Sequence, residues 1–204
     1  FYSQNRAVTS QDYKTLVYSM PPQFGSIKRC NLIQDSDSFK RNLNLYVISE
    51  DASGNLTQSN SYIKQNLKTW LNRNRMINDT IDILDAKIIN FAIDFDVLAE
   101  KGVNKHDLLD RCIRAIRNQF VQLPEMGESF SITRIYKILN LVPGVADTKR
   151  VEVYQKSGGK YSDVRFGVAA NTSADGRYIS IPKNVVYELK YPTQDIKGTV
   201  RSGH

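Results

Sequence analysis

The feature that most constrains the fold is a segment, residues 87–97, in which apolar and polar side chains alternate. Its large apolar side chains are Ile89, Phe91, Ile93, Phe95 and Val97. Successive side chains of a β-strand point to opposite faces of the sheet, so this pattern predicts a strand with one face in a core and the other wet or covered. The chain therefore contains a sheet with a buried face.

Four segments have the apolar spacing and the end signals of amphipathic helices. They cover residues 9–19, 61–76, 104–120 and 131–141. Thr9 with Asp12 three positions later matches an N-terminal capping arrangement, and Ser61 and Asn104 are candidate caps of the second and third helices. In the third helix apolar side chains recur every three or four residues, which predicts a buried stripe.

Other segments have the patterns of strands and turns. Residues 26–34 and 42–49 alternate, and turn residues separate them, which predicts an antiparallel hairpin. Beyond about residue 145, strand-like runs alternate with turns, and the dipeptides Gly158-Gly159 and Asp175-Gly176 suit tight hairpins. The end of the chain is therefore expected to be rich in β-structure.

Together these elements predict an α+β fold, a mixed helix and sheet core with a β-hairpin-rich C-terminal extension. Helices and strands intermix over residues 1–150, the predicted core, and strands dominate residues 151–200, the predicted extension. The hydrophobic fraction of 41% is sufficient for a buried core. Residues 201–204 resemble the remnant of an affinity tag, so no function is predicted from them.

The charge balance permits an acidic partner without requiring one. The chain has 28 basic and 21 acidic residues, a net charge of +7. The basic residues are spread along the chain, and the strongest cluster, Arg111, Arg114 and Arg117, lies on one predicted helix, where a solvated face explains it. No stretch reaches the roughly 18 apolar residues of a membrane helix. We therefore expect neither a membrane nor a specific nucleic acid as partner.

The cysteines and the start of the chain bear on where it assembles. Cys30 and Cys112 lie inside apolar periodic segments, which predicts a reduced, buried pair. Phe1 stands where Met would begin a complete chain, and no signal peptide follows it. We expect a fragment of a longer protein that assembles in the cytoplasm.

Side chains that carry catalysis are scarce. His106 and His204 are the two histidines, so a histidine-based triad or zinc site lacks material. Asp94 and Asp96 share one face of the strand predicted at residues 87–97, a spacing that could hold a divalent cation, but an exposed sheet face explains both equally well. The sequence therefore predicts no catalytic residue, no cofactor-binding residue, no metal site and no enzyme.

Three stretches resemble the baseplate J-like family of contractile tails, over nearly all of residues 5–155. They are residues 5–13, residues 89–120 and residues 127–145. The first, Asn5-Arg6-Ala7-Val8-Thr9 with Asp12-Tyr13, is similar to the family's opening motif, a short arm that enters a capped helix. The last ends in Val142-Pro143-Gly144-Val145, similar to the family's turn from a helix into a strand.

This resemblance implies a structural protein of the virion. Arg6, Thr9, Asp12 and Gly144 would be structural residues of the motifs. The extension after Tyr154 is most similar to the large wedge subunits of T-even-type phages. The resemblance implies a late protein that forms homodimers and a ring, binds other baseplate wedge proteins, takes no small-molecule substrate, and couples baseplate rearrangement to sheath contraction. Its place would be the tail baseplate, assembled in the host cytoplasm.

The extension is also predicted to supply the homodimer contact. Its strands carry many aromatic and branched side chains, and Tyr178, Ile179 and Tyr187 are the candidate contact residues. The alternative is that the extension folds back over its own core. Two other functions stay open, a basic nucleic-acid-binding domain and, less favoured, a metal-assisted hydrolase that uses Asp94 and Asp96.

Overall fold

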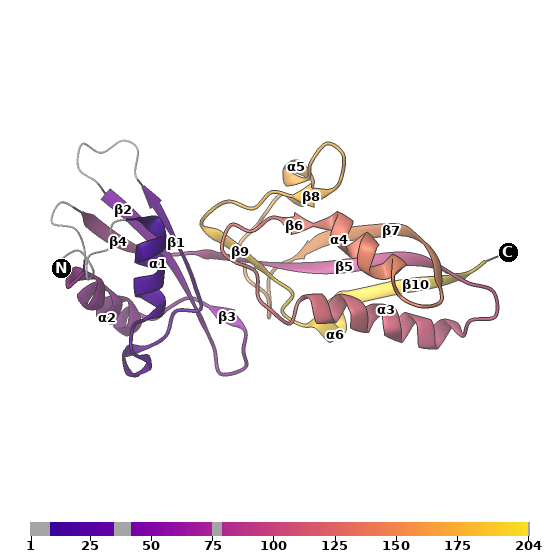
Figure 1. Cartoon of the computed structure of the whole chain (residues 1–204), viewed down its shortest axis with the longest axis horizontal. Helices are drawn as coiled ribbons and strands as arrows, with labels where there is room; N and C mark the ends of the chain where they lie inside the picture. The colour runs from indigo at the N-terminus through magenta and orange to yellow at the C-terminus, as the bar shows by residue number, and fades with distance from the viewer. Residues whose placement is uncertain (1–8, 35–41, 75–78, 204) are drawn as a thin grey trace. The chain divides into compact units, whose positions relative to one another are not determined.

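The computed structural model describes residues 9–34, 42–74 and 79–203 (Figure 1). The chain divides into two compact units. Unit 1 holds residues 1–87, 125–127 and 183–185, and unit 2 holds residues 88–124, 128–182 and 186–204. Both contain helices and strands, so the predicted α+β class is confirmed.

Unit 1 is a small sheet packed against two helices. Its elements are α1 (Ser10–Tyr18), η2 (Pro22–Phe24), β1 (Arg29–Gln34), β2 (Asn42–Glu50), β3 (Leu56–Thr57), α2 (Ser61–Asn72) and β4 (Thr80–Asp85). Strand β2 pairs antiparallel with β1 and β3 and parallel with β4. The predicted hairpin of residues 26–34 and 42–49 is therefore confirmed.

The two helices of unit 1 begin and pack as their patterns predict. Thr9 caps α1 in a full capping box, because its side chain accepts from the Asp12 backbone N–H at 3.1 Å and Asp12 accepts from the Thr9 N–H at 2.9 Å. Helix α2 is capped by Asn60, one residue before the predicted Ser61. Tyr13 is buried in the core that α1 and α2 share with the sheet, and its hydroxyl donates to the buried Asp79 carboxylate.

Unit 2 is organised around β5 (Lys87–Ala99), the strand predicted from its alternation. Strand β7 (Val145–Lys156) pairs with it antiparallel, β10 (Ile196–Ser202) pairs with it parallel, and β9 (Val185–Glu188) also pairs with it. Two helices complete the core, with α3 (Lys105–Gln119) packed on β10 and α4 (Ile132–Asn140) on β7. Short elements fill the connections: β6 (Phe130–Ser131), α5 (Val168–Asn171), β8 (Tyr178–Ile179) and α6 (Pro192–Asp195).

The faces of β5 differ as its alternation requires. The five alternating apolar side chains from Ile89 to Val97 are completely buried. Phe91 lies 5.7 Å from Phe130 and 5.7 Å from Tyr187 between ring centroids, so the core of unit 2 is aromatic where β5 enters it. The predicted buried stripe of α3 is confirmed, since Leu108, Cys112 and Ile116 are fully buried.

The predicted extension does not form a separate layer of hairpins. Residue 150, the expected boundary, lies inside β7, and the chain divides after Lys87 instead. Strands β9 and β10 both pair with β5 because that long strand has backbone donors and acceptors along both edges. The extension therefore folds back over its own core, the alternative left open by the sequence.

The two predicted turns of this region have different outcomes. The turn at Asp175-Gly176 forms a small hairpin, in which Thr172 bridges to Ile179. The turn at Gly158-Gly159 also forms, but irregular chain follows it in the described segment, so the hairpin prediction there is wrong. Arg201 and Ser202, taken for a tag remnant, lie in β10 opposite Leu98 and Ala99.

Both cysteines are free thiols, and both are buried, as predicted. Burial raises the pKa of each to about 11. Within the described ranges, no helix combines the length and the apolar character that a bilayer span demands.

The packing of β10 on β5 requires glycine at position 198. A Cβ at this position would lie 2.2 Å from the ring of the fully buried Phe95, so Gly198→Ala forces the ring or the strand to move. We expect the free energy of unfolding, measured in urea, to fall by about 1–3 kcal/mol.

The matched control is Gly167→Ala, where the new Cβ lies no closer than 3.5 Å to any neighbour. We expect a change within about 0.5 kcal/mol. Equal losses for the two variants would contradict the close approach of β10 to Phe95.

Candidate interaction surfaces

The sheet of unit 2 has a charged face opposite its apolar core. Asp94 and Asp96 of β5 point to this face, and the register places them beside Glu152 and Arg150 of β7. Paired residues of neighbouring strands share a face, so these four side chains form one cluster, to which Arg201 of β10 adds a second guanidinium. The cluster lies on the second face that the alternation of β5 predicts, and this face is largely covered, since Asn90, Ala92 and Asp96 are buried.

Arg150 is the centre of this charged cluster. Its Nη2 lies 3.2 Å from Asp94 Oδ2, its Nε 3.3 Å from Asp96 Oδ2 and its Nη1 2.6 Å from Glu152 Oε2. The hydrogen bond to Asp94, followed by that to Asp96, raises the pKa of Arg150 further above its ordinary value. Arg201 Nη2 lies 3.4 Å from the same Asp96 oxygen.

Arg150 and Arg201 hold Asp94 and Asp96 in ion pairs. The guanidinium of Arg150 donates to both carboxylates and so bridges them. No cluster of three or more His, Cys, Asp or Glu side chains suited to a metal ion occurs in residues 9–34, 42–74 and 79–203. The geometry is that of a cross-strand ion-pair network.

A second cluster combines tyrosines and lysines at the end of β7. Tyr161 and Tyr191 meet edge to face, with ring centroids 5.6 Å apart. Lys156 Nζ lies 5.8 Å from the centroid of the Tyr154 ring and 5.9 Å from that of Tyr161, and Lys190 Nζ lies 5.7 Å from that of Tyr191. Three of the tyrosines near the end of the chain are therefore brought together, which spacing in the sequence does not predict.

This tyrosine cluster is anchored by a buried acid. The Tyr161 hydroxyl donates to Asp195 Oδ1 at 2.8 Å, and Asp195 is 2% exposed. Burial, followed by this hydrogen bond, raises the pKa of Tyr161 to about 12. The second oxygen, Oδ2, has no hydrogen-bond partner among the described residues.

The three predicted contact residues do not form one surface. Tyr178 is 47% exposed, but Ile179 and Tyr187 are buried inside this chain, so their prediction as contact residues is wrong. Ile179 pairs with Phe130 between β8 and β6, and Tyr187 stacks on Phe91. The alternating pattern predicted correctly that Ile179 and Tyr187 are buried on one side. The residues that bury them belong to the core of the same chain and not to a second copy.

The family-motif residues have the structural positions expected of them where they are described. Thr9 and Asp12 cap α1. Gly144 has φ +99°, and a Cβ there would lie 3.2 Å from Leu108 and from Val103, so the turn into β7 needs glycine. Arg6 lies outside the described residues.

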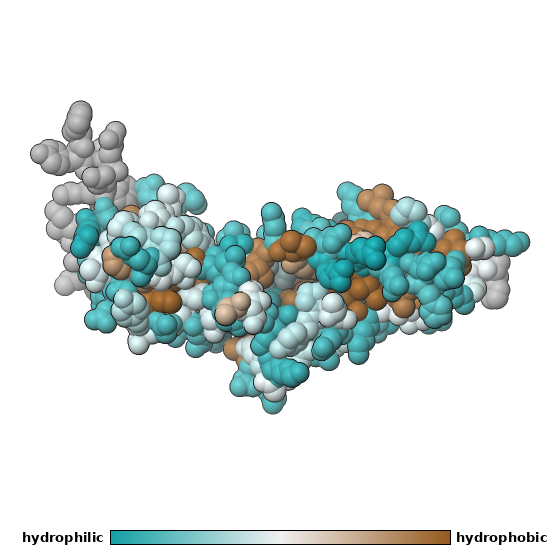
Figure 2. Space-filling model, turned by 90° about the horizontal axis from the view of Figure 1, so that it is seen from below, coloured by the Kyte–Doolittle hydropathy of each residue, from teal (hydrophilic) through white to brown (hydrophobic). Residues whose placement is uncertain are grey.

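A groove with a largely apolar lining lies between α3 and α4, and the sequence did not reveal it. It has a volume of about 410 Å³. Residues of α3 line one side, and residues at the end of α4 line the other. Its lining is Arg111, Arg114, Ala115, Asn118, Ile138, Leu141, Val142 and Pro143. Viewed from the side of α3, hydrophobic patches of this surface are bordered by hydrophilic ones (Figure 2).

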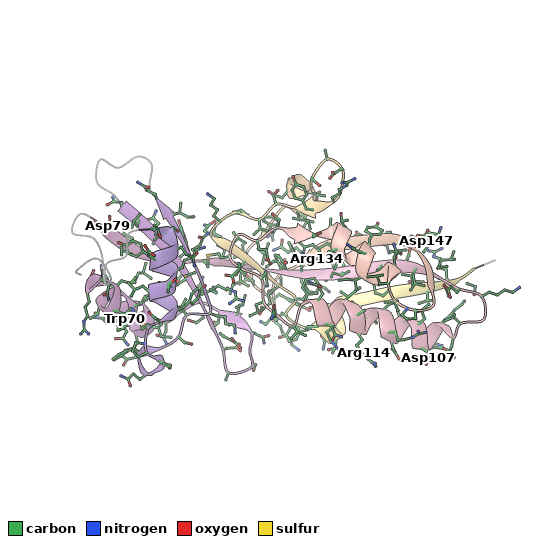
Figure 3. The ribbon with its side chains drawn as sticks, in the orientation of Figure 1. Trp70, Asp79, Asp107, Arg114, Arg134 and Asp147 are labelled. Carbon is green, nitrogen blue, oxygen red and sulfur yellow. The ribbon has the colours of Figure 1, made fainter. Side chains whose placement is uncertain are left out.

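The arginine cluster on α3 is only partly the solvated face that the sequence predicts. Arg114 is exposed and points away from the helix (Figure 3). Arg111 folds back and donates to the Pro143 carbonyl at 2.5 Å, so it fixes the end of α4 against α3.

A smaller cavity, of about 200 Å³, lies where α3 ends and α4 begins. Phe120, Phe130 and Tyr187 form its aromatic wall, and Glu128 and Arg134 contribute charge. Burial, followed by the charge of nearby Glu128, raises the pKa of Tyr187. The cavity therefore lies at the outer edge of the aromatic core of unit 2.

Comparison with models of protein families gives no match, and comparison with curated proteins gives none either. Among solved structures, the chain is similar to a chain in the cryo-EM structure of the anti-feeding prophage (AFP) baseplate, 6-fold symmetrised. The TM-score is 0.55 at 10% sequence identity. The likeness is one of fold. It covers 91% of this chain and 38% of the length of the baseplate chain, so the present chain matches about two fifths of that protein.

The tyrosine cluster yields a test of its anchor. Tyr161→Phe removes the donor to the buried Asp195 carboxylate, so we expect the free energy of unfolding to fall by about 1–3 kcal/mol. Tyr154→Phe is the control in the same cluster, and we expect a change within about 0.5 kcal/mol.

A double-mutant cycle identifies the partner. In an Asp195→Asn background the cost of Tyr161→Phe should shrink, because the unpaired carboxylate is already gone. An unchanged cost in that background would contradict the pairing.

Proposed function

We propose that this chain is part of a structural subunit of a contractile-tail baseplate. The observation that supports the proposal is the fold shared with a chain of the anti-feeding prophage baseplate across 91% of the present chain. The resemblance of the motifs around Thr9 and Gly144 to the baseplate J-like family points the same way. In its finer form, the proposal makes the chain the C-terminal part of a wedge subunit like the large wedge subunits of T-even-type phages.

The surfaces of unit 2 suit assembly better than catalysis. The carboxylates that come nearest to a catalytic pair, Asp94 and Asp96, are engaged by Arg150. These ion pairs are partly buried, since the side chain of Asp96 is 12% exposed. Charged groups at an interface influence which surfaces fit together more than they raise affinity. The proposal therefore assigns the chain no catalytic residue, cofactor or small-molecule substrate. Its proposed partners in the virion baseplate are other wedge proteins and further copies of the chain itself.

A basic nucleic-acid-binding module is the second candidate function. The observation in its favour is the tyrosine–lysine cluster, since aromatic rings beside cations stack on single-stranded bases. The hydroxyl of Tyr161 and the amine of Lys190, which donates to the Lys160 carbonyl, are already engaged within the chain. The structural role is favoured for that reason.

The proposed function is tested by locating the protein in assembled particles. A full-length protein with an epitope tag on an exposed turn of this region, for example at Lys101-Gly102, should label contractile tails at the baseplate in electron micrographs. Its deletion should yield particles without functional baseplates. Label on the capsid, or normal tails without the protein, would contradict the proposal.

Self-association has its own test, with Tyr178 as the remaining exposed member of the predicted contact. We expect concentration-dependent dimers by light scattering at tens of micromolar. Tyr178→Glu should weaken them about tenfold, because an exposed aromatic contact is replaced by a charge. Tyr62→Glu is the matched control, since Tyr62 is 63% exposed on α2.

A chain that stays monomeric at those concentrations, or equal weakening by both variants, would contradict the proposed dimer contact. Truncation after Tyr154 is unsuitable for this test because it removes β9 and β10 from the sheet of β5.

A further inference from the structure

The groove between α3 and α4 is open along two helical turns. Arg111, Ala115 and Asn118 follow one another along its α3 wall at spacings of four and three residues. At 1.5 Å per residue these positions span about 10 Å of α3. Such a groove between two packed helices matches the ridge of a third helix.

The floor of the groove is apolar and uncovered. Leu141 closes α4 and is 75% exposed, and Ile138, one turn earlier, is half-buried beside it. Ala115 faces them from α3 without a long side chain, which leaves room above it. A contiguous exposed apolar patch bordered by polar side chains is typical of an interaction site.

The α3 wall of the groove carries positive charge. Arg111 and Arg114 line it, and no carboxylate does. Arg114 makes no ion pair within the described part of the chain, and its guanidinium points to solvent (Figure 3). Arg111 donates a hydrogen bond to the Pro143 carbonyl, which ties the end of α4 to α3 beside the groove.

We propose that this groove binds an acidic amphipathic helix of a partner protein. The apolar ridge of that helix packs on Leu141, Ile138 and Ala115, and its flanking carboxylates pair with Arg114 and Arg111. Charge complementarity selects this occupant, since a basic helix would bring like charges together in a partly desolvated groove. The inference rests on the groove alone and stands whether or not the chain belongs to a baseplate.

The probe is a fluorescein-labelled synthetic helix of about 18 residues, with Leu at three- and four-residue spacing and Glu on both flanks. Its partner probe has Lys in place of every Glu. Binding to the whole chain is followed by fluorescence anisotropy. We expect the Glu peptide to bind at micromolar concentrations, to weaken with salt, and to bind about tenfold more tightly than the Lys peptide.

Variants on exposed side chains locate the site without disturbing the core. Leu141→Asp and Arg114→Glu should each weaken the Glu peptide about tenfold. Val121→Asp is the matched control, because Val121 has the same 75% exposure as Leu141 and lies outside the groove lining. Circular dichroism and urea unfolding confirm that each variant is folded.

Several results would overturn the proposal. They are the absence of binding at high micromolar peptide, equal loss in Val121→Asp, and equal binding of the Lys peptide. Loss of self-association in Leu141→Asp, with no effect on the peptide, would make a second copy of the chain the occupant. Tight binding of a single-stranded DNA oligonucleotide that Arg114→Glu removes would make the occupant a nucleic acid. A folded chain that fails these tests and yet labels baseplates would leave the proposed function intact.

Discussion

Strand β5 imposes the constraint on which the rest of unit 2 depends. Thirteen residues of extended backbone need hydrogen-bond partners on two edges, and five large apolar side chains need cover on one face. Segments from distant parts of the chain meet these needs, with β7 on one edge and β9 and β10 completing the sheet. Gly198 of β10 faces the ring of Phe95, which leaves no room for a side chain at this position. The packing of β5 therefore constrains even the last strand of the chain.

The other face of the same strand shows why a pair of carboxylates is weak evidence for catalysis. Asp94 and Asp96 lie on one face because strand geometry puts alternate residues there, and two arginines from neighbouring strands neutralise them. The result is a charged cluster on a face of β5 that the chain partly covers. Its fixed pattern of guanidinium and carboxylate groups can discriminate between partners even where it adds little to stability.

Two chains can share a fold at low sequence identity because packing constrains positions more than identities. The likeness to a baseplate chain at 10% identity is of this kind, and it extends over nearly the whole present chain. What differs between such proteins is the surface. In unit 2 the groove between α3 and α4 and the charged face of the sheet are the features where partner choice can reside.

The sequence by itself determined the local structure. The alternation of β5, the capping box of Thr9 and Asp12, and the buried stripe of α3 depend on neighbours within a few residues, so each could be predicted correctly. The motif residue Gly144 was likewise identified, although its reason, a turn with positive φ packed against Leu108, needed the structure.

Tertiary structure alone decided how these elements combine. Residues 151–200 were expected to form their own hairpins, but which edge a strand joins depends on pairing across a hundred residues, and β5 offered two long edges. For the same reason Ile179 and Tyr187 are core residues, although their pattern is equally that of a contact surface. The groove at Leu141 was hidden because it belongs to two helices at once. A sequence pattern shows which side chains must be covered, and only the folded chain shows what covers them, because burial is a property of pairs of distant segments.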